Sequence, residues 1–589
     1  MERRWTWEFD VPRRRLWKYV ADTDWVNRHA GLPPIEARYE PLLDGGSRRI
    51  ARFRRTPFTI EWEERPTVWR VPEFFEIERR YRRGPLARFF ARTTLEATQR
   101  GTRVTVDVTL EPAMAGVRAF LPLIARRGRR GADRAFRLAA VLAAADVRAS
   151  GPADTTELGA FARLAEADVR RDVVAALANH VATAEDRELA AMRPYELADR
   201  WKLSRRETLR AFLHATRLGL LNLSWNVLCP GCRGATPGFD SLEGLQHGYH
   251  CDSCNLPFDP QFDRSVEVTF DARPLGRRAE PELFCIASPQ RSDFVHAQAV
   301  IPPRGQSRLA LDLERGSYQL TAIGAGSAAF VASDEEPALA LTAALTLHGM
   351  AAGQSIRSGA SAIELTSELD REVLVRIEAG RWPDTLATAA QVTALEEFRQ
   401  LFSSQVLAPG FEMSIQTMAV LFTDLMGSTA IYTRTGDAPA FRIVSDHFEV
   451  MREIVSTYEG TIVKTIGDAV MAVFVDPAKC LEAALRFDAA VGRIDAGGEP
   501  LRLRAGFHVG PCIAMRANER IDYFGTTINL ASRLQALAGG GEVTLARTVA
   551  ESPAIAARLR SLTTATTLEP LELKGFPQRI DVVRICRQA

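Results

Sequence analysis

The sequence predicts a multidomain α+β protein, and its length, composition and hydrophobic patterning all point to this class. The chain has 589 residues, which corresponds to about three to six domains at roughly 100–200 residues per domain. Hydrophobic residues make up 46% of the chain and charged residues 25%, as is usual for folded globular proteins. Stretches of alternating apolar and polar residues are interspersed with stretches of helical spacing, so both strands and helices are expected.

The composition also excludes several classes of protein. No run of 18 or more apolar residues occurs, and Met1–Trp5 lacks the apolar character of a signal peptide, so we expect a cytoplasmic protein without a membrane span. The formal net charge is only +2, so the chain as a whole has no strong positive potential that would attract nucleic acid. That total conceals a basic N-terminal quarter, because residues 1–150 contain 31 Lys and Arg against 19 Asp and Glu.

Residues 1–150 are expected to form an α+β domain. A strand-like start is followed by two short helices from Pro12, by alternating strand-like runs up to residue 111, and by a long helix over residues 113–147. This order resembles the START-like (polyketide-cyclase) helix-grip fold. The resemblance implies a cavity between the sheet and the last helix for an apolar small-molecule ligand. A plain α+β interaction domain is the alternative.

Residues 151–225 are expected to be mainly helical. Within them, a helix, a short turn, a second helix from Ser204 and a strand-like end resemble a winged helix-turn-helix. A DNA-reading helix of that kind would present three basic side chains, Arg205, Arg206 and Arg210. The alternative is a pair of helices packed in the protein interior. Because the net charge is small and no specific DNA-reading motif is present, nucleic acid is not expected as a partner.

Four cysteines form the clearest metal-binding pattern, in a segment expected to span residues 226–265. The spacing is C-x2-C-x18-C-x2-C, carried by Cys229, Cys232, Cys251 and Cys254. Each C-x2-C pair can direct two thiolates at one ion, and four thiolates suit tetrahedral Zn²⁺. We interpret the segment as a zinc ribbon with one structural Zn²⁺. A redox-active dithiol pair is the alternative.

Two further segments precede the C-terminal third. Residues 266–385 contain short alternating runs, which predict a β-rich, sandwich-like domain. Residues 386–411 are expected to form a linker helix, because Val392, Leu395 and Phe398 recur at three- and four-residue steps. Such an apolar face suits dimerisation or signal transmission. The alternative is a helix packed on its own domain.

The chemistry is expected in residues 412–589. An apolar strand ends at Asp424, and the turn Gly427-Ser428-Thr429 leads into a helix. The backbone N–H groups of such a turn bind phosphate, and a carboxylate beside it holds Mg²⁺. About forty residues later a predicted hairpin carries Asp468 at its tip, next to a glycine. Two carboxylates on adjacent strands are what two-metal phosphoryl transfer requires.

A helix with two polar groups on one face follows. Gly525 allows a tight turn before it, and Asn529 and Arg533 lie four residues apart. They therefore share one helix face. A neutral donor and a planar cation on that face suit a ribose and a polyphosphate.

Taken together, five segments closely resemble the catalytic domain of the class III nucleotide (adenylate/guanylate) cyclases. They are FTDLMGST, VKTIGDAVMAVF, RAGFHVGP, DYFGTTINLASR and LELKGF, in the order and spacing of that family. The resemblance implies a ferredoxin-like fold and two Mg²⁺ or Mn²⁺ ions per active site, held by Asp424 and Asp468. It also implies roles in substrate handling for four other side chains: Lys464 and Asp522 read the base, Asn529 orients the ribose and the transition state, and Arg533 stabilises phosphate.

The base-reading pair narrows the substrate. In the family, Lys with Asp marks ATP, whereas Glu with Cys marks GTP. Adenine offers an acceptor at N1 and a donor at its 6-amino group, which Lys464 and Asp522 complement. Some family members carry a second Lys after the terminal Lys-Gly. Here Phe576 follows Gly575, so only Lys574 is available there and its role is undefined.

The expected function is an adenylate cyclase that converts ATP to 3′,5′-cyclic AMP and pyrophosphate, regulated by the upstream domains. In this family the metal carboxylates come from one catalytic domain and the base-, ribose- and phosphate-reading residues from another. One chain holds both sets, so a homodimer is expected through the catalytic domain and the 386–407 helix. Two alternatives are a catalytically degenerate cyclase-fold regulatory protein and a winged-helix transcription regulator with a nucleotide-sensing domain.

Overall fold

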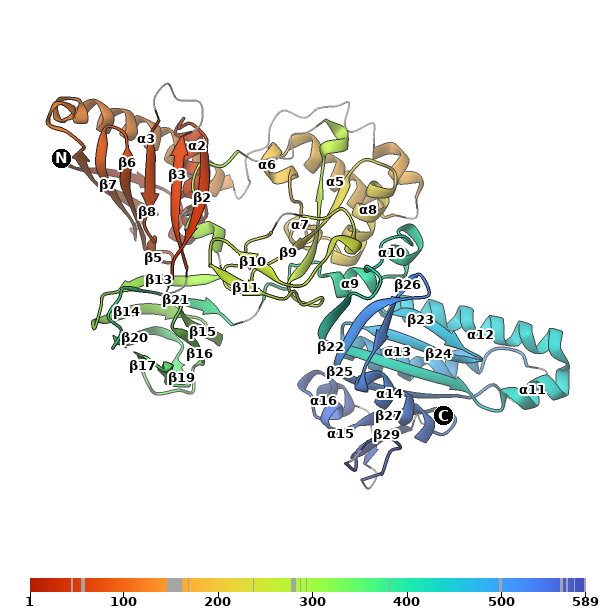
Figure 1. Ribbon diagram of the computed structural model, residues 1–589. Helices are drawn as coiled ribbons and strands as arrows, with labels where there is room; N and C mark the ends of the chain where they lie inside the picture. Colours follow the sequence, from red (N-terminus) through yellow and green to blue (C-terminus); the bar gives the residue numbers. More distant parts are fainter. Residues whose placement is uncertain are drawn as a thin grey trace.

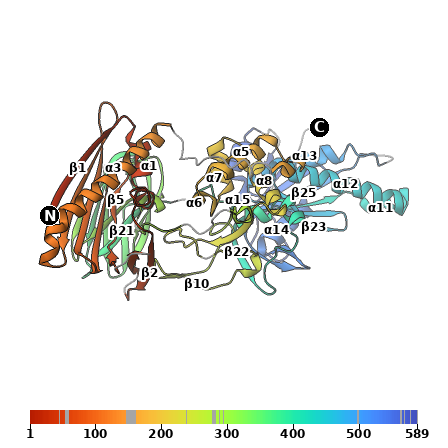
Figure 2. The ribbon, with the colours of Figure 1, turned by 90° about the horizontal axis from the view of Figure 1, so that it is seen from above.

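The computed structural model arranges the chain as a row of domains (Figure 1). The N-terminal domain and a β-rich domain lie at one end, a helical region lies in the middle, and the C-terminal domain lies at the other end. The view from above keeps the same order (Figure 2). The residues that the structure describes are 1–43, 46–53, 59–145, 161–167, 169–236, 238–276, 282–286, 288–292, 294–380, 382–496, 500–561, 565–567, 570–576 and 578–586. Residues 54–58 of the strand-like region, the end of the helix expected over residues 113–147 and the start of the helical segment expected from residue 151 therefore lie outside the described residues.

The N-terminal domain has the element order expected from the sequence. Its elements are β1 (Glu2–Phe9), α1 (Arg13–Val20), α2 (Thr23–His29), β2 (Ile35–Pro41), β3 (Ser47–Phe53), β4 (Glu61–Glu64), β5 (Val68–Arg70), β6 (Phe74–Arg83), β7 (Leu86–Ala97), β8 (Thr102–Pro112), η1 (Ala115–Phe120) and α3 (Leu121–Ala145). The long helix α3 lies across one face of the antiparallel sheet (Figure 2). Membership of the START-like family remains a prediction.

Side chains of α3 and of the sheet pack against each other. Trp7 on β1 and Phe136 on α3 meet edge to face, with ring centroids 5.1 Å apart, and Trp17, Phe75 and Leu95 are buried in the same core. Large aromatic rings bury much apolar area and occupy the volume that a ligand would need. The apolar ligand expected there is therefore not supported.

The β-rich domain is two packed sheets, and one of them continues the N-terminal sheet. Its strands are β13 (Val295–Ile301), β14 (Gln306–Leu313), β15 (Gly316–Ala322), β16 (Gly326–Ser333), β17 (Ala340–Thr346), β18 (Gly349–Ala352), β19 (Ser355–Arg357), β20 (Gly359–Ser367) and β21 (Val373–Ala379). One sheet runs β14-β20-β17-β18; in the other, β13 pairs with both β5 and β21. The two predicted domains thus share a continuous sheet.

The helical region is closed by a pair of strands that the sequence had placed in different domains. Its elements are η2 (Phe161–Glu166), α5 (Arg171–Thr183), α6 (Asp186–Leu189), α7 (Pro194–Trp201), α8 (Arg205–Arg217), β9 (Asn222–Val227) and β12 (Val266–Asp271), with η4 (Arg273–Leu275) and η5 (Pro289–Ser292) beyond. Strand β12 pairs with β9. The boundary predicted at residue 266 is therefore wrong, because period-2 alternation identifies a strand but not its partner.

The four cysteines lie on an excursion between β9 and β12. This excursion contains η3 (Leu242–Gly244) and the short hairpin β10 (Tyr249–Cys251) and β11 (Leu256–Phe258).

The linker helix expected over residues 386–411 is broken into two short helices, α9 (Ala389–Thr393) and α10 (Glu396–Leu401). Leu395 between them is extended, with φ −92° and ψ 130°, which no helical residue adopts. Val392 and Phe398 are buried in a core formed within this chain. The expectation that this face dimerises is thus not supported, and the alternative of packing on the chain's own domains is observed.

The C-terminal domain is a mixed sheet with helices on both faces. Its elements are β22 (Glu412–Leu425), α11 (Ser428–Thr435), α12 (Asp437–Thr457), β23 (Thr461–Ile466), β24 (Ala469–Phe474), α13 (Pro477–Val491), β25 (Leu503–Ala517), β26 (Arg520–Phe524), α14 (Thr526–Leu537), β27 (Glu542–Ala546), α15 (Arg547–Ala550), α16 (Pro553–Leu559), β28 (Ala565–Thr567) and β29 (Val582–Cys586). The strand order is β23-β24-β22-β25-β27-β29-β28, and β26 pairs with β25.

The central strand β22 contributes to two cores. Alternate residues such as Leu421 face the helices of its own domain, whereas Met418, Val420 and Phe422 join a core that continues into the helical region, α9 and α10. A bulge between Ile415 and Met418 leaves two backbone N–H groups outside the ladder, and the Asp263 carboxylate accepts both, from Gln416 and Thr417 at 3.0 and 3.2 Å. The upstream region and the sheet of the C-terminal domain therefore form one packed unit.

None of the helices in the described part of the chain is long and apolar enough to cross a membrane.

The shared core generates the first prediction. Phe398 is 1% exposed and packs edge to face on Trp225. Replacing it with Ala should lower the free energy of unfolding by about 3–5 kcal/mol, because a buried cavity remains. Denaturant unfolding of the full chain measures this change. Phe120→Ala, at an exposed site of the N-terminal domain, is the control, and equal effects of the two substitutions would contradict the shared core.

Candidate active site

Asp424 lies at the end of β22, where the sequence places a metal-binding carboxylate. In the register of β22 with β25, Asp424 is directly opposite Arg504. The Arg504 Nε donates to Asp424 Oδ2 at 2.8 Å, and Nη2 contacts the same oxygen. Because a carboxylate paired in this way is held in one orientation, a metal ion at Asp424 would compete with the guanidinium.

The turn after Asp424 has the conformation that the sequence indicates. Gly427 has φ +69°, a left-handed conformation that favours glycine, and α11 begins at Ser428. Ser428 is half-buried and Thr429 exposed in the first helical turn. The first N–H groups of a helix have no partner within the helix, so this turn is suited to bind an anion beside Asp424.

Asp468 lies at the tip of the hairpin formed by β23 and β24, after Gly467 with φ +65°. Thr423 pairs with Val470, so the residues that follow Thr423 and precede Val470 lie at the same end of the sheet. Asp424 and Asp468 are therefore neighbours on adjacent strands.

One oxygen of Asp468 is suited to a cation. Asp468 Oδ2 is buried and has no hydrogen-bond partner within the described residues. A buried carboxylate oxygen without a donor costs free energy unless a cation meets it. His447 on α12 donates no hydrogen bond to it, since both ring nitrogens of His447 lack a partner within the described residues; burial lowers the pKa of His447 to about 4, although the Asp468 charge acts in the opposite direction. The residues present thus fit a divalent metal ion.

The two base-reading candidates are in direct contact. Lys464 on β23 donates from Nζ to Asp522 Oδ2 on β26 at 2.6 Å, across 58 residues of sequence. The Lys464 ammonium also lies 5.5 Å from the centre of the Phe524 ring. Ammonium and carboxylate therefore form a preassembled donor–acceptor pair beside an aromatic ring.

Asn529 and Arg533 share the outer face of α14. Gly525, with φ +131°, precedes the helix, and Leu530 and Leu534 on its other face are buried in the domain core. Both polar side chains are exposed and make no side-chain hydrogen bond or ion pair within the described part of the chain.

The structure thus joins the predicted residues in two sets. Asp424, Asp468 and the Gly427 turn form one, and Lys464 with Asp522 forms the other, near a free Asn529–Arg533 face. Lys574 is exposed in a turn before β29 and joins neither set. Sequence reasoning missed Arg504 and His447. The RAGFHVGP segment begins at Arg504, but only the strand register shows that it reaches Asp424.

The four predicted zinc ligands converge. One sulfur from each of Cys229, Cys232, Cys251 and Cys254 lies within 4.8 Å of the others. The backbone N–H of Gly231 donates to Cys229 Sγ at 3.3 Å, and that of Gly234 to Cys232 Sγ at 3.4 Å. Such N–H groups stabilise thiolates, and four thiolates around one centre suit tetrahedral Zn²⁺. The cluster is consistent with a metal site, and the metal's identity remains a prediction.

Comparisons with known proteins agree with this geometry. Residues 412–583 match a family model described as "Adenylate and Guanylate cyclase catalytic domain", and residues 156–294 match a "Family of unknown function (DUF5939)". Among curated proteins, "Adenylate cyclase 2" of Rhizobium meliloti is 30% identical over 221 residues, which cover 34% of this chain and 60% of that protein. "Adenylate cyclase 1" of the same organism is 27% identical over 186 residues, 29% of this chain and 27% of that protein.

A solved structure also matches in part. The crystal structure of the adenylyl cyclase CyaB from P. aeruginosa is 21% identical and covers 30% of this chain and 97% of that one, with a TM-score of 0.27. The match covers 27% and 60% of the length of these two curated relatives, less than two thirds of either.

The C-terminal part of this chain is therefore a catalytic domain of the adenylate and guanylate cyclase family.

The cysteine cluster generates the second prediction. The purified chain should contain about one zinc per molecule, and Cys229→Ser should release it, because three thiolates bind Zn²⁺ less tightly than four. Elemental analysis of the two proteins measures this. Cys586→Ser, outside the cluster, is the control and should retain zinc. A folded, metal-free wild-type chain would refute the zinc assignment.

Proposed function

We propose that this protein is an adenylate cyclase that converts ATP to 3′,5′-cyclic AMP and pyrophosphate. The observation that carries the proposal is the 2.6 Å contact between Lys464 and Asp522, in a domain that also aligns Asp424 with Asp468. The names of the curated relatives, both adenylate cyclases, support the same assignment.

The choice of ATP rests on the pattern of donors and acceptors. Adenine presents an acceptor at N1 and a donor at its 6-amino group, which the Lys464 ammonium and the Asp522 carboxylate complement. Guanine presents the reverse pattern at the corresponding positions, so it would leave buried polar groups unpaired. Discrimination by unpaired polar groups is stronger than discrimination by shape alone.

The carboxylates and the turn would hold the triphosphate end. Asp424 and Asp468 would bind two Mg²⁺ or Mn²⁺ ions, which when bound supply Lewis-acid charge at the phosphates and acidify the ribose 3′-hydroxyl. Arg504 balances the charge of Asp424 in the structure and would release it to the metal. The N–H groups of the Gly427-Ser428-Thr429 turn would bind phosphate oxygens.

Asn529 and Arg533 would orient the ribose and stabilise charge on the reacting phosphate. Their four-residue spacing puts both on one face of α14, where the amide can bind ribose and the guanidinium phosphate oxygens. The 3′-oxygen would attack the α-phosphorus in line as the bond to pyrophosphate breaks. Catalysis would then come from positioning and charge stabilisation, without a covalent enzyme intermediate.

A homodimer is proposed because each half of the site borders exposed apolar surface. Met426, Ile466 and Phe524 are 42, 55 and 40% exposed, and each lies within two residues of a proposed site residue. Exposed apolar side chains grouped in this way mark interaction surfaces. A twofold dimer would bring the Asp424–Asp468 set of one copy to the α14 face of its partner, forming two equivalent sites.

Regulation by the upstream region is proposed to act through α10. Glu396 accepts a hydrogen bond from Thr461 on β23 at 3.1 Å, and Arg399 donates to the Ile521 carbonyl on β26 at 3.4 Å. These two strands carry Lys464 and Asp522. On the other side, Arg210 of α8 pairs with Glu397 at 2.7 Å. A movement of the helical region would thus alter the spacing of the base-reading pair.

The two alternative functions are less well supported. A transcription regulator would use the arginines of α8, but Arg205 pairs with Asp199, Arg206 donates to Ser456 of the C-terminal domain, and Arg210 pairs with Glu397. These contacts hold α8 inside the protein. A degenerate cyclase would be expected to have lost some site residues, whereas both sets are present.

The third prediction concerns the substrate. With Mn²⁺, the full chain should turn over ATP with kcat/KM at least about tenfold above that for GTP, because only adenine pairs fully with Lys464 and Asp522. The double variant Lys464→Glu/Asp522→Cys should lose ATP turnover and shift the preference toward GTP. Lys479→Gln, at a Lys whose partner is Glu459, makes the same net charge change as the double variant and is the control. A folded wild-type chain that turns over neither nucleotide would refute the enzyme.

The fourth prediction concerns the dimer. Asp424→Ala and Arg533→Ala should each be inactive alone, but mixed heterodimers should recover activity, because one of their two sites takes intact halves from both chains. Mixing Asp424→Ala with Asp468→Ala is the control, since every site in that heterodimer lacks a metal carboxylate. Absence of recovery in verified heterodimers of the first pair would exclude the shared site.

A further inference from the structure

A cavity of about 430 Å³ lies where the N-terminal domain, the four-cysteine segment and the β-rich domain meet. Ligand sites for small molecules typically enclose about 300–1,000 Å³ and occur preferentially at domain junctions. The cavity is distant in sequence from every residue of the proposed cyclase site. It is also separate from the space beneath α3, where the sequence had suggested an apolar ligand.

Three neighbouring strands form one wall of the cavity. In the shared sheet, Trp69 on β5 is opposite Gln298 on β13, and Gln298 is opposite Arg376 on β21. Cross-strand neighbours present their side chains on the same face of a sheet, and all three line the cavity. The row forms at the junction of the two sheets, so it exists only when the two domains are joined.

Arg376 is a buried cation beside the four-cysteine group, because Cys232 and Cys251 line the same cavity. It is 5% exposed, its Nε donates to Gln298 Oε1 at 2.7 Å, and its Nη1 donates to the Gly231 carbonyl at 3.3 Å. No carboxylate forms an ion pair with it among the described residues. Glu378, two residues along β21, forms no ion pair with Arg376; burial raises the pKa of Glu378, although the charge of Arg376 acts in the opposite direction. An unpaired charge in such surroundings is costly unless an anion binds.

A second arginine faces the same space. Arg49 on β3 lines the cavity and has no ion-pair partner in the part of the chain that the structure describes. The acidic residue in the lining, Asp252, is directed to His250 at 3.2 Å. The hydroxyl groups of Thr236 and Ser288 and the side chains of Trp69 and Ile286 also line the cavity, as do two cysteines of the four-cysteine group. The lining therefore offers positive charge, hydrogen-bond donors and a small apolar patch.

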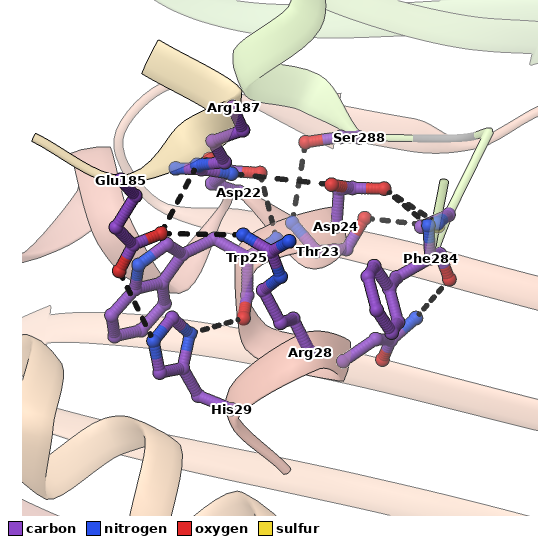
Figure 3. A network of polar contacts seen from close by, with 12 residues as sticks. Asp22, Thr23, Asp24, Trp25, Arg28, His29, Glu185, Arg187, Phe284 and Ser288 are labelled. Atoms are coloured by element: carbon purple, nitrogen blue, oxygen red, sulfur yellow. Dashed lines mark hydrogen bonds and ion pairs between the residues drawn. The ribbon is translucent and has the colours of Figure 1, made fainter. Parts of the chain in front are cut away.

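The cavity wall is tied to the helical region through a polar network (Figure 3). Ser288 donates to the Ala21 carbonyl and accepts from the Thr23 N–H, next to Asp24, whose carboxylate accepts from the N–H groups of Phe284 and Cys285. Arg187 on α6 forms an ion pair with Asp22 at 3.4 Å. A ligand that moves this wall would therefore act on the helical region, which contacts the catalytic domain.

We propose that this cavity binds a small anion carrying a carboxylate or phosphate group, held by Arg376 and Arg49. Gln298 orients the Arg376 guanidinium. Arg376 Nη2 makes no hydrogen bond within the described residues, so it can donate to the anion. A guanidinium with two donors already fixed is well suited to a planar or tetrahedral oxyanion. The proposal is independent of nucleotide turnover.

The test is anion binding to the full chain. Inorganic phosphate and succinate, each at constant ionic strength balanced with chloride, are titrated by calorimetry and by thermal unfolding. We expect saturable binding of at least one of them, and their comparison separates a phosphate ligand from a carboxylate ligand. Arg376→Gln and Arg49→Gln should each weaken that binding at least tenfold, and Arg376→Lys should restore part of it. Arg308→Gln, an exposed arginine on β14, is the matched control.

Several outcomes would overturn the proposal. If phosphate binds only at the catalytic domain, Arg376→Gln and Arg49→Gln would both leave the affinity for phosphate unchanged. If Arg376 only balances the charge of the cysteine cluster, Arg376→Gln would release zinc while Arg49→Gln left phosphate and succinate binding intact. Absence of saturable binding of either anion to the zinc-loaded wild-type chain would likewise reject the site. Arg49 is half-buried, so its variant should remain folded even if the Arg376 variant does not.

Discussion

The structure depends on the burial of both faces of β22. One face packs on the helices of the catalytic domain, and the other packs on a core that includes Phe262 and Phe398 of the upstream region. A strand buried on both sides cannot shift its register without exposing apolar side chains on one of them. The position of Asp424 at the end of this strand is therefore determined by the packing of the upstream region as well as by its own domain.

The proposed active site is arranged as two incomplete halves. In one, the charge of Asp424 is met by Arg504, while an oxygen of Asp468 remains buried without a donor. In the other, Lys464 and Asp522 satisfy each other, while Asn529 and Arg533 on α14 are exposed. Within each half, some charged groups are paired with each other. Each half also contains polar groups without a partner, which a metal ion, a nucleotide or a second copy of the chain would supply. That division accounts for why one fold can hold every site residue and still be proposed to act as a dimer.

Local features were predicted correctly where short-range rules decide them. The turn at Gly427 and the hairpin tip at Gly467–Asp468 follow from the conformational freedom of glycine and from alternation in the flanking strands. The convergence of the cysteines follows from C-x2-C spacing. The predicted helix over residues 386–411 failed because the three- and four-residue apolar spacing is preserved across two short helices. The break at Leu395 is accompanied by contacts of Glu396 and Glu397 with distant elements, which spacing does not reveal.

The sequence by itself determined the chemical inventory of this protein: two carboxylates at strand ends, a Lys–Asp pair, a polar helix face and four thiolates. These are carried by residue type and local spacing, which short-range sterics and hydrogen bonding translate directly into turns, strands and helices. Only the tertiary structure decided that β12 pairs with β9, that Arg504 reaches Asp424, and that Trp69, Gln298 and Arg376 form one row. Those relations join residues far apart in the chain, and they arise from strand register and shared burial, which no local pattern encodes.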